Sequence, residues 1–212
     1  MTSPVRQYSA ADRLIGRFAD GLRALSEGPA PRAAPAPPAA ELSEAERQRS
    51  VALMRVNHAG EVAAQGLYHG QALVARDPEL RRHLLDAARE ERDHLAWCAE
   101  RLGELRDGPS KLSPLWYAGS VTIGALAGLS GDRRSLGFVA ETERQVSAHL
   151  DEHLQRLPEA DRRSRAVVQA MKADEERHGA EALEAGGALP PPPVRGLMRA
   201  VAGLMKSAAA RW

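Results

Sequence analysis

The sequence predicts an all-α fold built around an antiparallel bundle of four long helices. Aromatic residues make up only 4% of the 212 residues, whereas Ala, Leu, Glu and Arg are abundant, and this composition favours helices over strands. Along four separate segments, apolar residues recur at intervals of three and four, as they do on the buried face of a helix. Capping residues, glycines and prolines mark where these segments begin and end.

The length and a proline-rich stretch near the N-terminus divide the chain into two parts. A chain of 212 residues can bury one core but is too short for two full-sized domains. Within residues 1–42, positions 8–26 are expected to form a short amphipathic helix, and an Ala/Pro linker that cannot hold a helix follows it. Residues 43–212 are therefore expected to form the one functional domain.

Four long helices are expected in that domain, and local signals set their ends. Ser43 with Glu46 three residues later is a capping-box pattern, and Asp77-Pro78 is a typical start for the next helix. Gly and Pro residues follow the expected ends. The expected ranges are 43 to about 76, 77 to between 103 and 109, 132–156 and 160–186.

Two further segments have the composition of elements that touch a membrane surface. Residues 112–131 carry no charge, but a proline, glycines and hydroxyl residues make them marginal as a membrane span, which needs about 20 strongly apolar residues. We expect a short helix inserted between the second and third long helices, either interfacial, with Trp116 and Tyr117 at its mouth, or packed on the bundle. Residues 194–212 are expected to form a basic amphipathic helix, which suits either an anionic membrane surface or packing against the bundle.

One glutamate interrupts the apolar stripe of each long helix: Glu61, Glu91, Glu143 and Glu175. Burying an ionised carboxylate is costly unless the group is paired or bound to a metal. The stripes contain no Lys or Arg that would neutralise four carboxylates. Four inward-facing carboxylates therefore predict a multivalent cation between the helices.

Two of these glutamates have a histidine three residues later on the same helical face, which pairs Glu91 with His94 and Glu175 with His178. Each half of the chain thus supplies one single glutamate and one Glu-x-x-His pair, at nearly the same separation. This ligand set is typical of ferritin-like proteins with two iron or two manganese ions, so the bundle is expected to be ferritin-like.

Six side chains for two metal ions imply that some ligands are shared. Glu91 and Glu175 are the expected bridges, which leaves Glu61 and Glu143 as terminal ligands on opposite metals. Carboxylate-rich ligands with one imidazole per metal favour iron or manganese over zinc, and this chemistry alone leaves the choice between iron and manganese open. The alternative is that these residues are ordinary surface charges. Both Glu-x-x-His motifs fall on the apolar stripes of their helices, and this argues against surface charges.

Other ionisable residues are expected to have ordinary roles. The glutamates that fall on other helical faces are expected to be solvated: Glu90, Glu141 and Glu176. Three histidines are expected at the surface or in packing: His69, His83 and His153. Two other histidines, His58 and His149, could either support the metal ligands from beside them or be ordinary core or surface residues. The single cysteine, Cys98, is expected to be a small core residue, which suits a reducing compartment.

Charge and motifs narrow the classes of function. The 29 Lys and Arg nearly balance the 28 Asp and Glu, so no overall field favours nucleic acid as a partner. The sequence contains neither a G-x-G-x-x-G pattern nor a P-loop, so electrons for a redox reaction are expected from an external donor. The first residues lack the long apolar core of a secretion signal, and cytosolic synthesis is expected.

The segments that carry the ligands resemble the bacterial demethoxyubiquinone hydroxylase family over about residues 43–212. They read LMRVNHAGEVAAQGLYHGQ, EERDHLAWCAERL, SLGFVAETERQVSAHLDEHL and ADEERHGAEALEAGG. The resemblance implies a di-iron monooxygenase that uses dioxygen to hydroxylate the benzoquinol ring of a polyprenylated ubiquinone precursor. It also implies a peripheral protein on the cytoplasmic face of the inner membrane, with other ubiquinone-biosynthesis proteins as partners. By the same resemblance, residues 116–129 dip into the membrane and guide the isoprenoid tail.

Two rival functions share some of these features. A ferroxidase or iron-storage protein would use the same ligands, but it has no need for an uncharged insertion between the second and third helices. A membrane-associated lipid-binding protein with a structural metal would need the insertion but would have no redox activity to lose. Iron content and oxygen consumption separate these alternatives from the hydroxylase.

Overall fold

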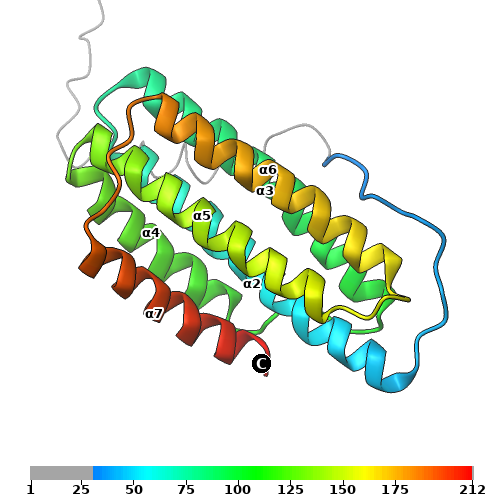
Figure 1. Ribbon diagram of the computed structural model, residues 1–212. Coiled ribbons are helices and arrows are strands. Elements are labelled where there is room, and N and C mark those ends of the chain that lie inside the picture. The colour runs from blue at the N-terminus through cyan, green and yellow to red at the C-terminus, as the bar shows by residue number, and fades with distance from the viewer. Residues whose placement is uncertain (1–30, 212) are drawn as a thin grey trace, which may run out of the picture.

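The computed structural model describes residues 31–211, and within this range it contains six α-helices and no strand (Figure 1). The helices are α2 (Glu44–Val74), α3 (Pro78–Glu104), α4 (Ser113–Leu129), α5 (Asp132–Arg156), α6 (Arg162–Glu184) and α7 (Pro192–Ala209). The all-α prediction is therefore confirmed. The amphipathic helix expected at residues 8–26 lies outside the described residues.

The four long helices α2, α3, α5 and α6 form the bundle (Figure 1). Among the four long helices, α2 packs mainly along α3 and α5 packs mainly along α6, so the bundle consists of two helical hairpins. Contacts between α3 and α6, and between α2 and α5, close the two hairpins on each other. This arrangement is the expected antiparallel bundle, because consecutive long helices joined by short loops pack as antiparallel neighbours.

The local signals place the helix ends as predicted. Ser43 and Glu46 form both hydrogen bonds of a capping box at the start of α2, and the side chain of Asp77 accepts a hydrogen bond from the Glu79 backbone at the start of α3. Helix α6 begins two residues later than expected, because Asp161 acts as its N-cap and accepts from the Ser164 backbone N–H.

The apolar core has two parts, with the glutamate layer between them along the bundle. One cluster gathers around Met54, Trp97, Leu150 and Met171. The other lies nearer the opposite ends of the same helices and includes Tyr68, Leu84, Leu136 and Ala182. The two clusters hold the four helices in register on both sides of the glutamates. Cys98 is fully buried in the first cluster, as predicted.

Helix α4 lies on α2, and glycines bring the two backbones into contact. A Cβ atom added to Gly70 of α2 would lie 2.1 Å from the carbonyl oxygen of Val121, and one added to Gly124 of α4 would lie 2.2 Å from that of Leu67. Such distances leave no room for a side chain. The inserted helix therefore packs on the bundle through its glycines, and its leucines point elsewhere.

Helices α4 and α7 both lie on the side of the bundle formed by α2 and α5, away from α3 and α6 (Figure 1). Both carry large apolar side chains that remain exposed, and we call these residues the outer apolar face: Leu115, Ile123, Leu126, Leu129, Val194, Leu197, Val201 and Leu204. None of the described helices is both long and apolar enough to cross a membrane.

Residues 31–43 contain no helix, which agrees with the expected effect of the Ala/Pro composition. This N-terminal segment starts beside α3 and α6 and runs to the start of α2 (Figure 1). Ala34 and Leu42 are partly buried against the first core cluster, and the Arg163 side chain of α6 donates a hydrogen bond to the Pro37 carbonyl. The segment is thus docked on the bundle rather than extended away from it.

Candidate metal centre

The structure brings all six predicted ligands together in the middle of the bundle. Their side chains are buried, with exposed fractions of 4% or less. They form two overlapping groups in which the ligand atoms lie within 4.8 Å of one another. The groups are Glu61, Glu91, His94 and Glu175, and Glu91, Glu143, Glu175 and His178.

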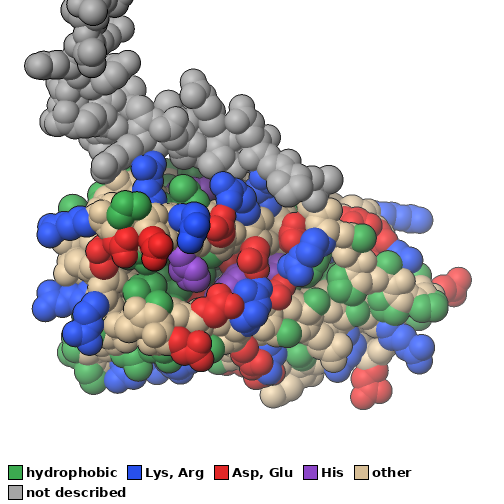
Figure 2. Space-filling model, turned by 90° about the horizontal axis from the view of Figure 1, so that it is seen from above, with side chains coloured by type: hydrophobic (Ala, Val, Ile, Leu, Met, Phe, Trp, Pro, Cys, Tyr) green, Lys and Arg blue, Asp and Glu red, His purple; other side chains and the backbone are tan. Residues whose placement is uncertain are grey.

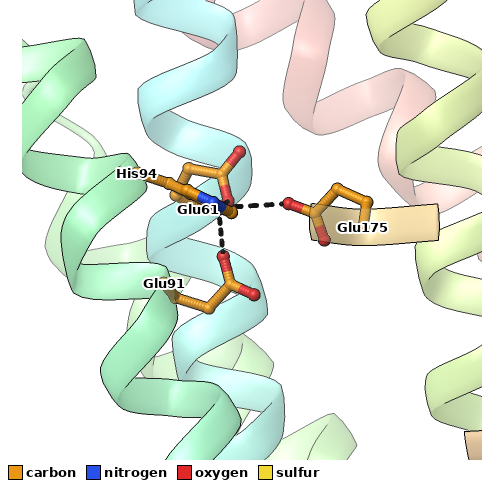
Figure 3. A group of neighbouring side chains, drawn as sticks. All are labelled: Glu61, Glu91, His94 and Glu175. Atoms are coloured by element: carbon orange, nitrogen blue, oxygen red, sulfur yellow. Dashed lines mark hydrogen bonds and ion pairs between the residues drawn. The ribbon is translucent and has the colours of Figure 1, made fainter. Parts of the chain in front are cut away.

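Both imidazoles turn the same ring nitrogen toward the shared glutamates. His94 Nδ1 lies 3.1 Å from Glu91 Oε2 and 3.2 Å from Glu175 Oε1, with Glu61 Oε2 at 3.7 Å (Figure 3). In the other group, His178 Nδ1 lies 3.6 Å from Glu91 Oε1 and 3.8 Å from Glu175 Oε2. Glu91 and Glu175 therefore occupy the positions between the two histidines, where ligands shared by two metals must lie.

Several ligand atoms at the centre form no hydrogen bond with any described residue. These buried atoms include Glu91 Oε1, Glu143 Oε2, Glu175 Oε2 and His178 Nδ1. Buried polar atoms in folded proteins nearly always have a partner, and leaving one unpaired is costly. The donor set, four carboxylates and two imidazoles, is the one that suits pairs of iron or manganese ions. The residues present therefore fit a pair of metal ions.

Electrostatics support the same interpretation. Burial raises the pKa of Glu61 well above its ordinary value, and the charges of Glu175 and Glu91 add to the effect. The pKa of Glu143 is raised in the same way, first by burial and then by Glu175. Although burial opposes the charged imidazole, contacts with Glu175 and Glu91 raise the pKa of His178 to about 9. Two protonated histidines balance only two of four carboxylates, whereas two divalent cations would balance all four.

A carboxylate contacts the Nε2 atom of each of the two histidines. Neither carboxylate was predicted from the sequence to be functional. His94 Nε2 lies 3.1 Å from Asp174 Oδ2, and His178 Nε2 lies 3.1 Å from Glu90 Oε2. Arg177 reaches both carboxylates, at 2.5 Å from Glu90 and 3.3 Å from Asp174. A carboxylate on the far nitrogen fixes the tautomer of a ligating histidine and orients its ring.

Glu90 is therefore not a solvated charge, and that prediction was wrong. Its side chain is only partly exposed and is hydrogen-bonded to Arg177 and His178 of α6. The face of α3 that Glu90 occupies lies next to α6, and periodicity along one helix does not show which neighbour covers which face. Figure 2 looks onto this side of the molecule, where acidic and basic side chains surround histidine side chains.

Glu141 also departs from its expected place. Its side chain is fully buried and accepts hydrogen bonds from Arg144 and Gln145. Gln145 in turn donates to the Arg195 carbonyl of α7, so this final helix lies next to the outer face of α5 that carries Glu141. Glu176 is exposed, as predicted.

The other five histidines belong to neither group of ligand atoms. His149 and His153 are in ring contact, with centroids 3.8 Å apart, and Lys206 lies 3.4 Å from His149 Nδ1. His153 and His69 are buried packing residues, and Tyr117 lies within hydrogen-bond distance of His69. His58 is buried, and burial lowers its pKa to about 4. His83 is partly exposed.

Tyr68 is a further residue of the centre that periodicity alone placed only in the core. It is buried on α2, and its hydroxyl donates a hydrogen bond to Glu143 Oε1. The two residues line a narrow, partly open hollow between α2 and α5, together with Ala64, Gln71, Val139 and Thr142. The cluster of predicted ligands therefore borders this hollow at Glu143, between α2 and α5.

Comparisons with known proteins point to one family. A sequence model of the family described as ubiquinone biosynthesis protein COQ7 matches residues 48–209. A 3-demethoxyubiquinol 3-hydroxylase of Xanthomonas campestris pv. campestris is 55% identical and aligns with 99% of this chain and 98% of its own length. The protein of that name from Ralstonia pickettii is 62% identical, over 82% of this chain and 80% of its own.

A solved structure supports the fold. The chain is similar to a dodecameric thioferritin, the bacterioferritin-related protein from Bacteroides fragilis, with a TM-score of 0.51. The match covers 65% of this chain and 84% of that one at 18% sequence identity. The bundle is thus ferritin-like, as the ligand spacing predicted.

Proposed function

The chain belongs to the COQ7 family of ubiquinone biosynthesis proteins, and we propose that it hydroxylates the benzoquinol ring of a polyprenylated demethoxyubiquinol with dioxygen at a pair of iron ions. The family to which it belongs is one of hydroxylating enzymes. The observation that carries the proposal is the buried cluster of four glutamates and two histidines, in a chain that matches named hydroxylases along nearly its whole length.

The proposed ligands of the iron ions are the six residues predicted from the sequence: Glu61, Glu91, His94, Glu143, Glu175 and His178. Glu91 and Glu175 would bridge the ions, because only these two belong to both groups. A pair of ferrous ions held there would supply the chemistry of dioxygen reduction, in which one oxygen atom enters a ring C–H bond and the other leaves with two protons as water. An external donor would have to supply two electrons for each turnover.

The protein's own part is to hold the ligands and to position the ring. Asp174 and Glu90 keep each imidazole turned with Nδ1 toward the shared glutamates. We propose that a flat ring approaches from the side of the hollow beside Glu143 and Tyr68, because its walls are mostly uncharged and it reaches a proposed ligand carboxylate. The hollow has room for only about one water molecule, so α2 and α5 must move apart to admit the ring. Holding the ring in one orientation there would decide which ring carbon reacts.

We also propose that the outer apolar face rests on the inner membrane. This face lies on the α2–α5 side of the bundle, the side on which the hollow opens. The exposed Arg199 of α7 and Arg211 just beyond it suit an anionic membrane surface. An isoprenoid tail that stays in the membrane could then leave its ring at the hollow. This placement favours a hydroxylase of a lipid substrate over an iron-storage protein, which has no use for an exposed apolar face.

Labelled dioxygen tests the proposed function. Protein loaded anaerobically with iron, reduced and supplied with a demethoxyubiquinol, is expected to contain two iron ions per chain and to place oxygen-18 from the gas into the new ring hydroxyl. Label that comes from water, without exchange of an intermediate with solvent, would overturn the monooxygenase assignment. Oxygen consumption without a ring product would favour a ferroxidase instead.

A further inference from the structure

Arg32, in the N-terminal segment, lies between two carboxylates of the bundle. Its Nε lies 2.5 Å from Asp93 Oδ2 on α3, and its Nη2 lies 2.8 Å from Asp174 Oδ2 on α6. The backbone N–H of Arg32 also donates to Asp93 Oδ1, at 3.1 Å. One guanidinium therefore joins the two helices that carry the Glu-x-x-His pairs, using the forked geometry that Lys cannot reproduce.

Trp97 fixes the backbone of the N-terminal segment at the same place. Its indole N–H donates a 2.7 Å hydrogen bond to the Arg32 carbonyl, and the Arg32 guanidinium lies 5.0 Å from the Trp97 ring centroid. The Trp97 ring is also in contact with the His94 imidazole, with centroids 5.3 Å apart. Arg32 is thus held by a residue that itself touches a proposed metal ligand.

Asp174 connects Arg32 to His94. The same oxygen, Asp174 Oδ2, lies 2.8 Å from Arg32 and 3.1 Å from His94 Nε2. If Asp174 moved away from His94, the imidazole would lose the contact that keeps Nδ1 turned toward Glu91 and Glu175. Arg32 draws Asp174 toward α3, the helix that carries His94, and this keeps the carboxylate in place.

The two histidines differ in this respect. His178 is held by Glu90, whose hydrogen-bond partners among the described residues are Arg177 and His178 itself, both on α6. Asp174 has a contact with Arg177 at 3.3 Å and the shorter contact with Arg32 from outside the bundle. The N-terminal segment therefore acts on only one half of an otherwise nearly symmetric centre.

We propose that Arg32 is a positioning residue that holds Asp174 against His94 and so fixes the geometry of the metal position that contains Glu61 and His94. The inference rests on the proposed metal pair but not on the identity of the substrate. It assigns a role to the N-terminal segment beyond that of a linker. Because exposed ion pairs contribute little to stability, loss of Arg32 should alter the centre without unfolding the bundle.

The test uses the full-length chain, freed of metal and titrated anaerobically with ferrous iron. Arg32→Gln is expected to lower the overall affinity for the ion pair by roughly tenfold, the lower end of the range for residues that support metal ligands. The affinity of Arg32→Lys for the ion pair should lie between that of Arg32→Gln and that of the unaltered chain. In Mössbauer spectra of the loaded protein, one of the two ferrous sites is expected to change and the other to keep its parameters.

Arg163→Gln is the matched control, because it removes a contact of the same segment, to the Pro37 carbonyl, without touching Asp174. Its iron affinity and spectrum should match those of the unaltered protein. A double-mutant cycle completes the design. If Arg32 acts through Asp174, adding Arg32→Gln to Asp174→Asn should have little further effect on iron affinity.

The outcomes separate the two proposals. If the unaltered chain binds no pair of ions, the proposed function and this inference both fail. If it binds two iron ions with two distinct sites, and Arg32→Gln leaves affinity and spectrum unchanged, only the positioning role is overturned. Additive effects of Arg32→Gln and Asp174→Asn would also overturn it, because they would show that Arg32 acts by another route.

Discussion

The hydroxyl of Tyr68 donates a hydrogen bond to the carboxylate of Glu143, and both side chains are buried where the hollow meets the proposed metal centre. Glu143 is the one ligand that lies in the wall of this hollow. The contact joins α2 to α5, the two helices on whose side of the bundle the outer apolar face lies. A ring that entered from this side, as proposed, would meet Tyr68 and Glu143.

Glu143→Ala is expected to abolish hydroxylation and to lower the iron content. The substitution removes the single ligand supplied by α5 and leaves the buried Tyr68 hydroxyl without its acceptor. Iron analysis and turnover of the purified variant check this. Glu176→Ala, which changes an exposed glutamate of α6, should leave both unchanged. Full activity and full iron content in Glu143→Ala would mean that the ligands are misassigned.

Gly124→Ala is expected to lower the free energy of unfolding by about 1–3 kcal/mol, as overpacking of a tight contact typically does. The added methyl group would lie 2.2 Å from the Leu67 carbonyl oxygen, so α4 must move away from α2. Gly119→Ala on the same helix meets nothing within 4 Å and should be neutral or stabilising by up to about 1 kcal/mol. Urea denaturation of both variants provides the comparison, and equal stabilities would contradict the close α2–α4 packing.

Lysine at Ile123 and Leu126 is expected to reduce turnover of a long-tailed substrate more than that of a short-tailed analogue. Both residues belong to the outer apolar face, so the change would weaken the proposed membrane contact and leave the proposed ligands in place. The variant should also float poorly with anionic liposomes. Leu183→Lys on α6 alters an exposed leucine away from this face and serves as the control. Equal losses for both substrates would make α4 a purely structural element.

Acid should destabilise the protein partly through His153. Burial, with smaller contributions from Arg156 and Lys206, lowers the pKa of His153 to about 3. Below pH 6.5 the unfolded chain binds a proton that the folded chain does not, so the free energy of unfolding falls as the pH drops toward 3. One such histidine accounts for up to about 2 kcal/mol between pH 7 and pH 5.

The pH dependence of His153→Gln isolates this effect. Its stability should decline less than that of the unaltered chain between pH 7 and pH 5 in chemical denaturation. His83→Gln, at a partly exposed position of α3, should follow the unaltered protein. If the two variants behave alike, the buried His153 does not contribute to acid sensitivity.

Much of the fold follows from local sequence signals. The limits of α5 match the predicted range, and Ser43 and Asp77 cap their helices as expected, because capping depends only on neighbouring residues. The six residues that the structure brings together could be predicted because each of them interrupts or follows an apolar stripe. A residue inside a buried stripe points to the bundle axis whatever the partner helices are.

The residues around the ligands could not be found in this way. Glu90 and Asp174 each hold a histidine on the opposite helix, so their role depends on how α3 and α6 face each other. Glu141 is buried next to α7, whose position no local pattern gives. Arg32 acts from a segment that its composition describes only as a linker. These roles come from contacts between distant parts of the chain.

The division of ligands between the two hairpins has a consequence for metal loading. Each group takes three side chains from one hairpin and one glutamate from the other, and the borrowed glutamates are Glu175 and Glu91. At the proposed metal pair, the first ion to bind would therefore be held by both hairpins and would fix both borrowed carboxylates. The second ion then finds its ligands already ordered and should bind with positive cooperativity, so that chains with two ions or none prevail over chains with one.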